Sequence, residues 1–428
     1  MSREAGGRAG ARAPSGPPSD DAKTERTKTD AKTDDPPRIT MSTCTARWAE
    51  PTEIDEWDAL VAGNPAGGDF LVTRTFAAAK RLVGWHPRFV VFERGGATAD
   101  GGARADGDSR TGTGASTGTG TAREGVALVL ERRVPLLGAY WYVTHGPAAT
   151  EPAGFAAQLE ALRALAASSR PRVFGITVEP PILATPEHEA ELERWVAASP
   201  GISRREGIQG NTDTVVVDID RDDEALLASF HKKCRNMISR AERDGVTVRE
   251  YPADAETFAH MHRLMRLVGG GKGGLSIRPR AYMEELWRGF ATAGQGRFFG
   301  IEVDGSPALL AFVIRIGSEA TYKDGGSERE RTSPGMSNYL QWSAMRAMRD
   351  EGATSYDMFG IAPEWATSNE DHSSYELGRF KLSFGPRVTH VGAFDVALRP
   401  CVWRLWRSIG ERVVSALHRR RYGDFSLY

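Results

Sequence analysis

The pattern of apolar and polar positions occurs twice along this chain in the same order. In the first half, helical periodicity at 51–62 and 73–83 precedes apolar runs at 88–94, 125–135 and 139–147, and a helical stretch at about 152–169 precedes a run at 172–180. In the second half, helical segments precede apolar runs at 297–303 and 308–316 and a strand-like segment at 319–326, and a helix at about 336–351 precedes a run at 355–361. Continuous apolar runs of this length are typical of buried strands.

The repeated order, helix–strand–strand–strand–helix–strand, predicts two mixed α/β domains of similar topology. It is typical of the N-acetyltransferase (GNAT) fold, so the expected fold class is α/β (α+β), with tandem GNAT-like domains and mixed sheets. The predicted first domain spans 43–205 and the second spans 206–395. Asp304 and Gly305 predict a hairpin turn in the second domain.

Two segments lack the large apolar side chains that a folded core requires. Residues 1–42 are rich in Gly, Pro, Ala and mixed charges, and we predict that they are disordered. Residues 95–123 are of low complexity and rich in Gly and Thr. Because strand-like runs flank this second segment, we interpret it as a flexible loop inside the first domain.

The balance of charges excludes a protein that coats nucleic acid along its whole surface. Fifty-five basic residues nearly cancel 56 acidic ones, so any site for a polyanion must be a local patch. Cys44, Cys234 and Cys401 are far apart and form no Cys-x-x-Cys pair, which argues against a disulfide scaffold or a metal site. No run approaches the ~18 apolar residues of a membrane-spanning helix. We expect a cytoplasmic monomer without a bound metal.

Residues 226–245 predict a single amphipathic helix. Its apolar positions recur at helical spacing and form a buried face, which comprises Leu226, Leu227, Phe230, Cys234, Met237, Ile238 and Ala241. Lys232, Arg235, Ser239 and Arg243 line the opposite side. That side is either a solvated face or a stripe that contacts phosphate, and the helix alone does not distinguish the two.

Residues 396–428 predict a basic amphipathic helix after the second domain. The expected apolar face comprises Val402, Leu405, Trp406, Ile409, Val413 and Leu417, and six arginines occupy much of the remainder. We favour packing of this helix on the first domain. The alternative is peripheral contact with anionic lipid at the inner surface of the membrane.

Seven short motifs resemble, in order, those of one enzyme family. They are GDFLVTRTFAAAKRLVGW at 68–85, YVTHGP at 142–147, GNTDTVVVDID at 210–220, KKCRNMISRAERDGVTV at 232–248, SIRPRAYMEEL at 276–286, GMSNYLQWSAMRAMRDEGATSYDMFGI at 335–361 and LGRFKLSFGPRVTHVGAFD at 377–395. Together they resemble the FemABX family of peptidoglycan bridge-forming aminoacyltransferases, over roughly residues 46 to 400. Because residues 251–296 carry two short helical patterns and no heptad run, the chain resembles the compact branch without a coiled-coil arm.

Some positions depart from the family pattern. His145 replaces the arginine before Gly-Pro, Ser239 replaces an arginine of the basic helix, and Pro386 replaces a glycine. Arg74 and Phe76 stand where the family has a Gln-Ser-x-x-Trp run. These departures leave the identity of the acceptor more open than the fold.

The resemblance implies that an amino acid passes from aminoacyl-tRNA to the stem-peptide amine of a muramyl-peptide precursor, either UDP-linked or lipid-linked. The product is a branch or cross-bridge of peptidoglycan, a polymer that sets cell shape. Because the ester is already activated, the reaction needs neither a cofactor nor a nucleophilic side chain. It needs positioning and a cation or N–H donors for the developing oxyanion.

The family's "FK" motif places the catalytic cation at Lys381. Its neighbour Phe380 is a substrate-binding candidate that shields the lysine or stacks on the terminal adenosine. The purely structural alternative is a lysine at the edge of the core that extends past aromatic rings. We name no general base. Asp357 lies near the expected cleft, but we favour a role in capping a strand end.

The resemblance also implies contacts to the phosphates of both substrates. Lys80, Arg278 and Tyr282 match family positions that bind the acceptor, the two cations at its diphosphate. Lys232, Lys233 and Arg235 are candidates for contact with tRNA or phosphate. Plain surface charge is an equally good explanation of Lys80 and Arg278.

Two other functions compete with this one. The first is a coenzyme A-dependent N-acyltransferase of the GNAT fold that acts on a small-molecule or cell-envelope amine. Such enzymes carry Q/R-x-x-G-x-G/A before a helix. Here Arg331 lies four residues before Gly335 and Met336 follows, so the motif is not met. The second is a non-catalytic RNA-binding or scaffolding protein.

Overall fold

The computed structural model describes residues 44–94, 122–269, 277–328, 333–424 and 426–428. The segment 1–42, predicted to be disordered, lies outside these residues, and so does the loop predicted at 95–123 except for its last two positions. Within the described residues, no helix has both the length and the apolar character that crossing a membrane requires.

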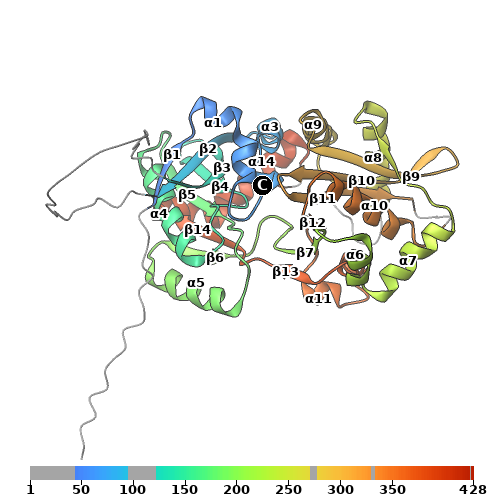
Figure 1. Ribbon diagram of the computed structural model, residues 1–428. Helices are drawn as coiled ribbons and strands as arrows, with labels where there is room; N and C mark the ends of the chain where they lie inside the picture. The colour runs from blue at the N-terminus through green and yellow to red at the C-terminus, as the bar shows by residue number, and fades with distance from the viewer. Residues whose placement is uncertain (1–43, 95–121, 270–276, 329–332, 425) are drawn as a thin grey trace, which may run out of the picture. The chain divides into compact units, whose positions relative to one another are not determined.

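The first sheet has seven strands in the order β1-β2-β3-β4-β5-β14-β6 (Figure 1). The strands are β1 (Cys44–Trp48), β2 (His86–Arg94), β3 (Ala122–Val134), β4 (Gly138–Val143), β5 (Val173–Val178), β6 (Ile202–Arg205) and β14 (Ala393–Ala397). The helices between β1 and β6 are α1 (Pro51–Asp55), α2 (Trp57–Ala62), η1 (Phe70–Val72), α3 (Arg74–Leu82), α4 (Pro152–Ser168) and α5 (Pro186–Ala198). β4 and β5 pair in parallel, and the other neighbours are antiparallel.

The second sheet also has seven strands, in the order β13-β7-β12-β11-β10-β9-β8 (Figure 1). The strands are β7 (Asp213–Asp218), β8 (Arg249–Tyr251), β9 (Gly296–Val303), β10 (Ser306–Ile316), β11 (Glu319–Ser327), β12 (Ser355–Asp357) and β13 (Arg387–Thr389). The helices are α6 (Asp223–Ser229), α7 (Lys232–Arg243), α8 (Ala255–Gly269), α9 (Arg280–Thr292), α10 (Met336–Asp350), α11 (Glu364–Thr367) and α12 (Tyr375–Leu382). β9 and β10 are joined at Asp304 and Gly305, whose φ angles of 53° and 78° confirm the predicted turn.

The middle positions of β3 and β10 form continuous apolar stretches because both faces of each strand are buried there. Along β3, Val126 and Leu128 enter one core, whereas Ala127 and Val129 enter another. Along β10, Leu310 belongs to the same core as Val126. One hydrophobic core is therefore shared by the two sheets.

The segment after the second sheet returns to the first. β14 lies between β5 and β6 and pairs with both in antiparallel fashion. It is followed by α13 (Pro400–Leu405), the π-helical turn η2 (Trp406–Gly410) and α14 (Glu411–Tyr422). Trp403 and Trp406 are buried against Tyr140, with ring centroids at 6.2 and 5.1 Å. Gly175 of β5 is needed there, since a Cβ would lie 2.2 Å from the Trp403 ring.

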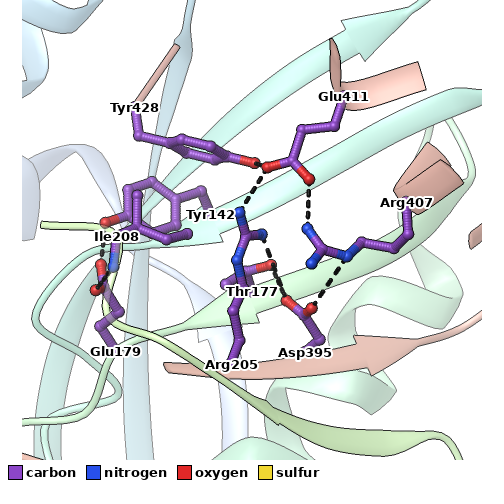
Figure 2. Close-up of polar contacts among 9 residues, drawn as sticks. All are labelled: Tyr142, Thr177, Glu179, Arg205, Ile208, Asp395, Arg407, Glu411 and Tyr428. Atoms are coloured by element: carbon purple, nitrogen blue, oxygen red, sulfur yellow. Dashed lines mark hydrogen bonds and ion pairs between the residues drawn. The ribbon is translucent and has the colours of Figure 1, made fainter. Parts of the chain in front are cut away.

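A polar network fixes this C-terminal segment to the first sheet (Figure 2). Arg205 of β6 donates to Glu411 at 2.7 Å, and the Tyr428 hydroxyl donates to the same carboxylate. Arg407 contacts Glu411 and lies 3.6 Å from Asp395 of β14. The single acidic residue of the segment 400–422 is thus turned inward.

The predicted apolar face of the C-terminal helix is wrong in part. Trp406 is buried as expected, but Leu405, Ile409, Val413 and Leu417 are exposed. The buried face consists of Trp403, Trp406 and His418, and Val402 packs against the same core as predicted. The large rings fill the space over β5, so the aliphatic side chains lie on the opposite side.

The single helix predicted at 226–245 is also wrong, because the chain breaks between α6 and α7. Phe230 is extended, with φ −77° and ψ 156°, and its ring packs edge-on against Trp342 and Phe384. The amide of His231 donates to the Ser383 carbonyl at 3.0 Å instead of continuing the helix. Tertiary contacts of Phe230 and His231 therefore override the local helical pattern.

Candidate functional site

Lys381 lies on α12 with its side chain buried. Its Nζ donates to the main-chain carbonyls of Phe359 and Gly360 at 3.0 and 2.9 Å. Phe359 has a φ of 57°, a left-handed conformation that is rare for a large side chain. At Gly378, a Cβ would lie 2.4 Å from the Thr367 side chain, so the glycine lets α12 approach α11 closely. The motif's glycine and lysine thus place a cation beside the loop that follows β12.

Burial is the main influence on the charge of this lysine. It lowers the pKa of Lys381 to about 8, although the Asp357 carboxylate acts in the opposite direction and Lys323 adds to the lowering. With that pKa, most molecules carry the ammonium at neutral pH. The side chain is therefore a buried cation held by two carbonyls, and not an exposed surface lysine.

A cavity of about 910 Å³ lies in the second half of the chain, beside Lys381. Its lining includes Tyr322 and Phe380, and Nζ of Lys381 is 5.7 Å from the centroid of the Tyr322 ring. Phe380 also packs edge-on against Phe384 at 5.4 Å. Lys381 is not itself a lining residue, but its ammonium lies near the lining ring of Tyr322, and its neighbour Phe380 belongs to the lining.

The cavity also reaches the first turn of α10, where Ser337 and Asn338 line it. Asn338 donates to the Cys234 sulfur at 3.3 Å, which joins α10 to α7. A Cβ on Gly335 would lie 2.0 Å from the Met237 carbonyl, so that glycine is required by the close approach of α7. Arg331, which the motif comparison used, lies outside the described residues.

The three cations predicted on α7 do not share one environment. Lys233 lines the cavity, and Lys232 is exposed. Arg235 instead donates to the carbonyls of Phe230 and Ala228, at 2.5 and 3.3 Å. Its guanidinium therefore caps the end of α6, whereas Lys233 lies in the lining of the cavity.

Lys80, Arg278 and Tyr282 come together in a second cluster. Nζ of Lys80 is 5.7 Å from the centroid of the Tyr282 ring, and the Arg278 guanidinium is 5.3 Å from the same ring. Lys80 is fully buried, and burial followed by the charge of Arg278 holds its pKa well below the ordinary value. The alternative of plain surface charge is therefore wrong for Lys80.

Residues from the C-terminal end of the sequence complete this second cluster. Arg278 donates to the Asp424 carboxylate at 2.8 Å and also to the main-chain oxygen of Tyr428. Asp424 has no exposed surface, and its pKa is lowered by His418 and Arg278 against the effect of burial. A carboxylate of the chain itself thus neutralises a cation that the resemblance assigns to the acceptor.

A cluster of ionisable groups that the sequence reasoning missed lies where the two sheets meet. His145 follows β4 and contacts the carboxylate of Asp69, while its ring centroid is 5.8 Å from that of His390. Burial opposes the charged form of His145, but Asp69 raises its pKa to about 9. The same charges act on Glu319 of β11, whose pKa is raised to about 8 by burial and then by Asp69.

Asp357, at the end of β12, belongs to the same cluster. Its carboxylate accepts hydrogen bonds from the Thr214 hydroxyl and, at 2.8 Å, from the Phe359 amide. Burial raises the pKa of Asp357, and these hydrogen bonds act against that shift. The role predicted for Asp357 at a strand end agrees with these contacts. Because Asp357 also acts on Lys381, it links the cluster electrostatically to the cation.

The sequence held one signal for this cluster: His145 departs from the arginine of the family motif. Asp69 and Glu319 gave none, because one caps the short helix η1 and the other begins a strand. Among the described residues, no group of histidine, cysteine and acidic side chains has the arrangement of a metal site.

Comparisons with known proteins agree with the α/β fold described above. Residues 228–368 match the Acetyltransf_6 family, described as an acetyltransferase (GNAT) domain. The chain is 22% identical over 441 residues to the proteins named lipid II:glycine glycyltransferase of Staphylococcus aureus strains MRSA252 and USA300, covering 84% of this chain and 95% of each relative. Among solved structures, the crystal structure of FemX aligns with a TM-score of 0.66 at 19% identity, over 84% of this chain and 99% of that one. The predicted α/β fold class with GNAT-like architecture is confirmed.

Proposed function

We propose that this chain is an aminoacyltransferase of peptidoglycan bridge formation. Its homology to the staphylococcal lipid II:glycine glycyltransferases confirms its resemblance to the FemABX family. The proposed donor is aminoacyl-tRNA and the proposed acceptor is a stem-peptide amine of a muramyl-peptide precursor. Glycine and a lipid-linked precursor are the first substrates to test, because the names of the relatives contain both.

The observation that carries the proposal is the buried ammonium of Lys381 close to Tyr322, a ring that lines a large cavity. When an amine attacks the ester carbonyl, a C–N bond forms and negative charge develops on the carbonyl oxygen. The C–O bond to the ribose then breaks and the leaving oxygen takes a proton. A cation fixed in a poorly hydrated site stabilises either developing oxyanion more strongly than one in water.

The cavity suits the adenosine end of a charged tRNA as donor. Phe380 and Tyr322 supply rings on which a base can stack, and Lys233 adds positive charge at the rim. A local basic patch is enough to contact the phosphates near the end of a tRNA, which agrees with a net charge near zero. No cofactor enters this proposal.

We assign proton removal from the acceptor amine to the carboxylate cluster of Asp69, Glu319 and Asp357. An attacking amine must be uncharged, and a proton acceptor works best when its pKa is near the operating pH. The pKa of about 8 for Glu319 meets that condition. Asp357 meets it less well, because its carboxylate is held in hydrogen bonds by Thr214 and Phe359.

The decisive experiment incubates the protein with tRNA charged with each amino acid and with muramyl-pentapeptide precursors. Mass spectrometry of the peptide should show an increment of one amino-acid residue, and ribonuclease treatment of the tRNA should abolish it. Separate reactions with UDP-linked and lipid-linked precursors identify the acceptor.

A coenzyme A-dependent acyltransferase is the competing function, and the cavity at the first turn of α10 favours testing it. The N–H groups of a first turn suit a pyrophosphate. Acyl transfer from acetyl-coenzyme A to the same peptide, without transfer from any charged tRNA, would overturn our proposal.

A further inference from the structure

The C-terminal helical segment, 400–422, has an unpartnered apolar side. Leu405, Ile409, Val413 and Leu417 retain 49, 53, 48 and 59% of their exposure, and we call these four residues the outer stripe. Ten large apolar side chains are exposed among the described residues, and the outer stripe holds four of them within 13 positions. Scattered surface leucines are ordinary, but a row of them on one element is not.

The geometry of the helix keeps the outer stripe on one side. Its members recur every four residues, a spacing that drifts slowly around a regular α-helix. The π-helical turn Trp406–Gly410 begins directly after Leu405 and contains Ile409, so the helix makes a wider turn there. Trp403, Trp406 and His418 anchor the other side in the core, so the outer stripe is held outward by the fold itself.

The charges of the helical segment itself are mostly positive. The segment 400–422 contains six arginines and one glutamate. The glutamate, Glu411, accepts from Arg205 and Tyr428 inside the protein (Figure 2). Arg404 and Arg412 are exposed beside the outer stripe, and Arg420 is exposed near its end.

We propose that the outer stripe, together with Arg404, Arg412 and Arg420, docks on the surface of an anionic phospholipid bilayer. An apolar row inserts at the boundary between headgroups and acyl chains, while arginines beside it pair with lipid phosphates. The segment lies along the bilayer surface and does not cross it. The candidate substrate-binding residues described above lie outside the outer stripe, so this inference does not rest on the proposed function.

A second copy of the chain fits the same surface less well. In a two-fold symmetric dimer the outer stripe of one copy would cover that of the other. The arginines beside both stripes would then face one another, and Glu411 is already engaged inside each copy. Charge complementarity therefore favours a surface of negative charge, which anionic lipid provides.

The test measures binding of the full chain to sedimenting vesicles of phosphatidylcholine alone or mixed with phosphatidylglycerol. The wild type should bind the anionic vesicles and not the neutral ones. Ile409→Glu and, separately, Leu417→Gln should weaken binding at least tenfold, and Arg404→Gln or Arg412→Gln about fivefold each. Leu183→Glu, at a similarly exposed leucine outside the helix, is the matched control and should bind like the wild type.

Circular dichroism and thermal unfolding check that each variant folds, as exposed positions should allow. Transfer to a soluble muramyl peptide should be unchanged in Ile409→Glu, which separates this inference from the proposed function. No binding of the wild type to anionic vesicles would overturn the inference, and so would equal binding by folded Ile409→Glu. A wild-type dimer that Ile409→Glu converts to monomer, without lipid binding, would identify a second copy as the occupant instead.

Discussion

Replacing Lys381 with methionine removes the buried ammonium and retains much of the volume of the side chain. Two effects on stability oppose each other. The lowering of the pKa from 10.5 to about 8 means that the native state holds this charge at a cost of about 3 kcal/mol, which methionine relieves. The carbonyls of Phe359 and Gly360 lose their donor, at about 1–3 kcal/mol each. The net change in the free energy of unfolding should therefore lie between about +1 and −3 kcal/mol.

The same substitution should slow the transfer reaction strongly. Removing one electrostatic stabiliser of an oxyanion slows the chemical step by about 100- to 1,000-fold. Single-turnover transfer from charged tRNA, followed by mass spectrometry of the peptide, measures that step. Chemical denaturation of the same sample measures the stability.

The matched control for this prediction is Lys323→Met. Lys323 also influences the pKa of Lys381 but donates to Asp324 at 3.0 Å, so its charge is already engaged. We expect that variant to retain most of its transfer rate. Folded Lys381→Met with a rate within threefold of the wild type would refute the assigned role. Equal losses of transfer rate in both lysine variants would indicate that the overall positive electrostatic potential of the region matters, and not the Lys381 ammonium specifically.

Three further predictions follow from the buried charges. Transfer by the wild type should decline above about pH 8 as Lys381 loses its proton, and Lys381→Arg should remove that decline from the pH–rate profile because guanidinium does not titrate there. The folded-state pKa of Glu319 is raised from 4.5 to about 8, so between these pH values the native state binds more protons than the unfolded chain, and stability is lost as the pH rises. Denaturation at several pH values should show the stability of the wild type falling relative to that of Glu319→Gln, by up to ~1.4 kcal/mol per pH unit. A constant difference between the two proteins would contradict the shift. Asp424→Asn removes the buried carboxylate that pairs with Arg278 and should lower the free energy of unfolding by about 3 kcal/mol, whereas no loss would show that the pair is dispensable.

The strands were predictable from the sequence because burial on both faces leaves a continuous apolar run. The run at 126–130 is such a case: Val126 and Ala127 enter different cores, so no polar residue interrupts these five positions. The turn at Asp304 and Gly305 was predictable for a local reason, since its two residues accept positive φ. The position of Lys381 followed from a family motif, which carries information that periodicity lacks.

The remaining features depend on contacts between residues far apart in the sequence. The break at Phe230 is set by the rings of Trp342 and Phe384 and by the Ser383 carbonyl, none of which the local pattern contains. The contact between Asp69 and His145 joins two loops of the first half, and Glu319 comes from the second. Helical periodicity likewise fails to decide which of two apolar sides a helix buries when large rings compete with aliphatic side chains.

The position of β14 between β5 and β6 has a consequence for how the protein is made. Synthesis proceeds from the N-terminus at about 5–20 residues per second, so the chain between Arg205 and Ala393 takes on the order of 10 to 40 s to follow β6. During that time β5 has an open edge, and β6 lacks the partner that joins it to the sheet. The nascent first half therefore offers a template for wrong strand pairing. A fragment ending at residue 205 should aggregate for the same reason, so the two halves are best expressed as one uninterrupted chain.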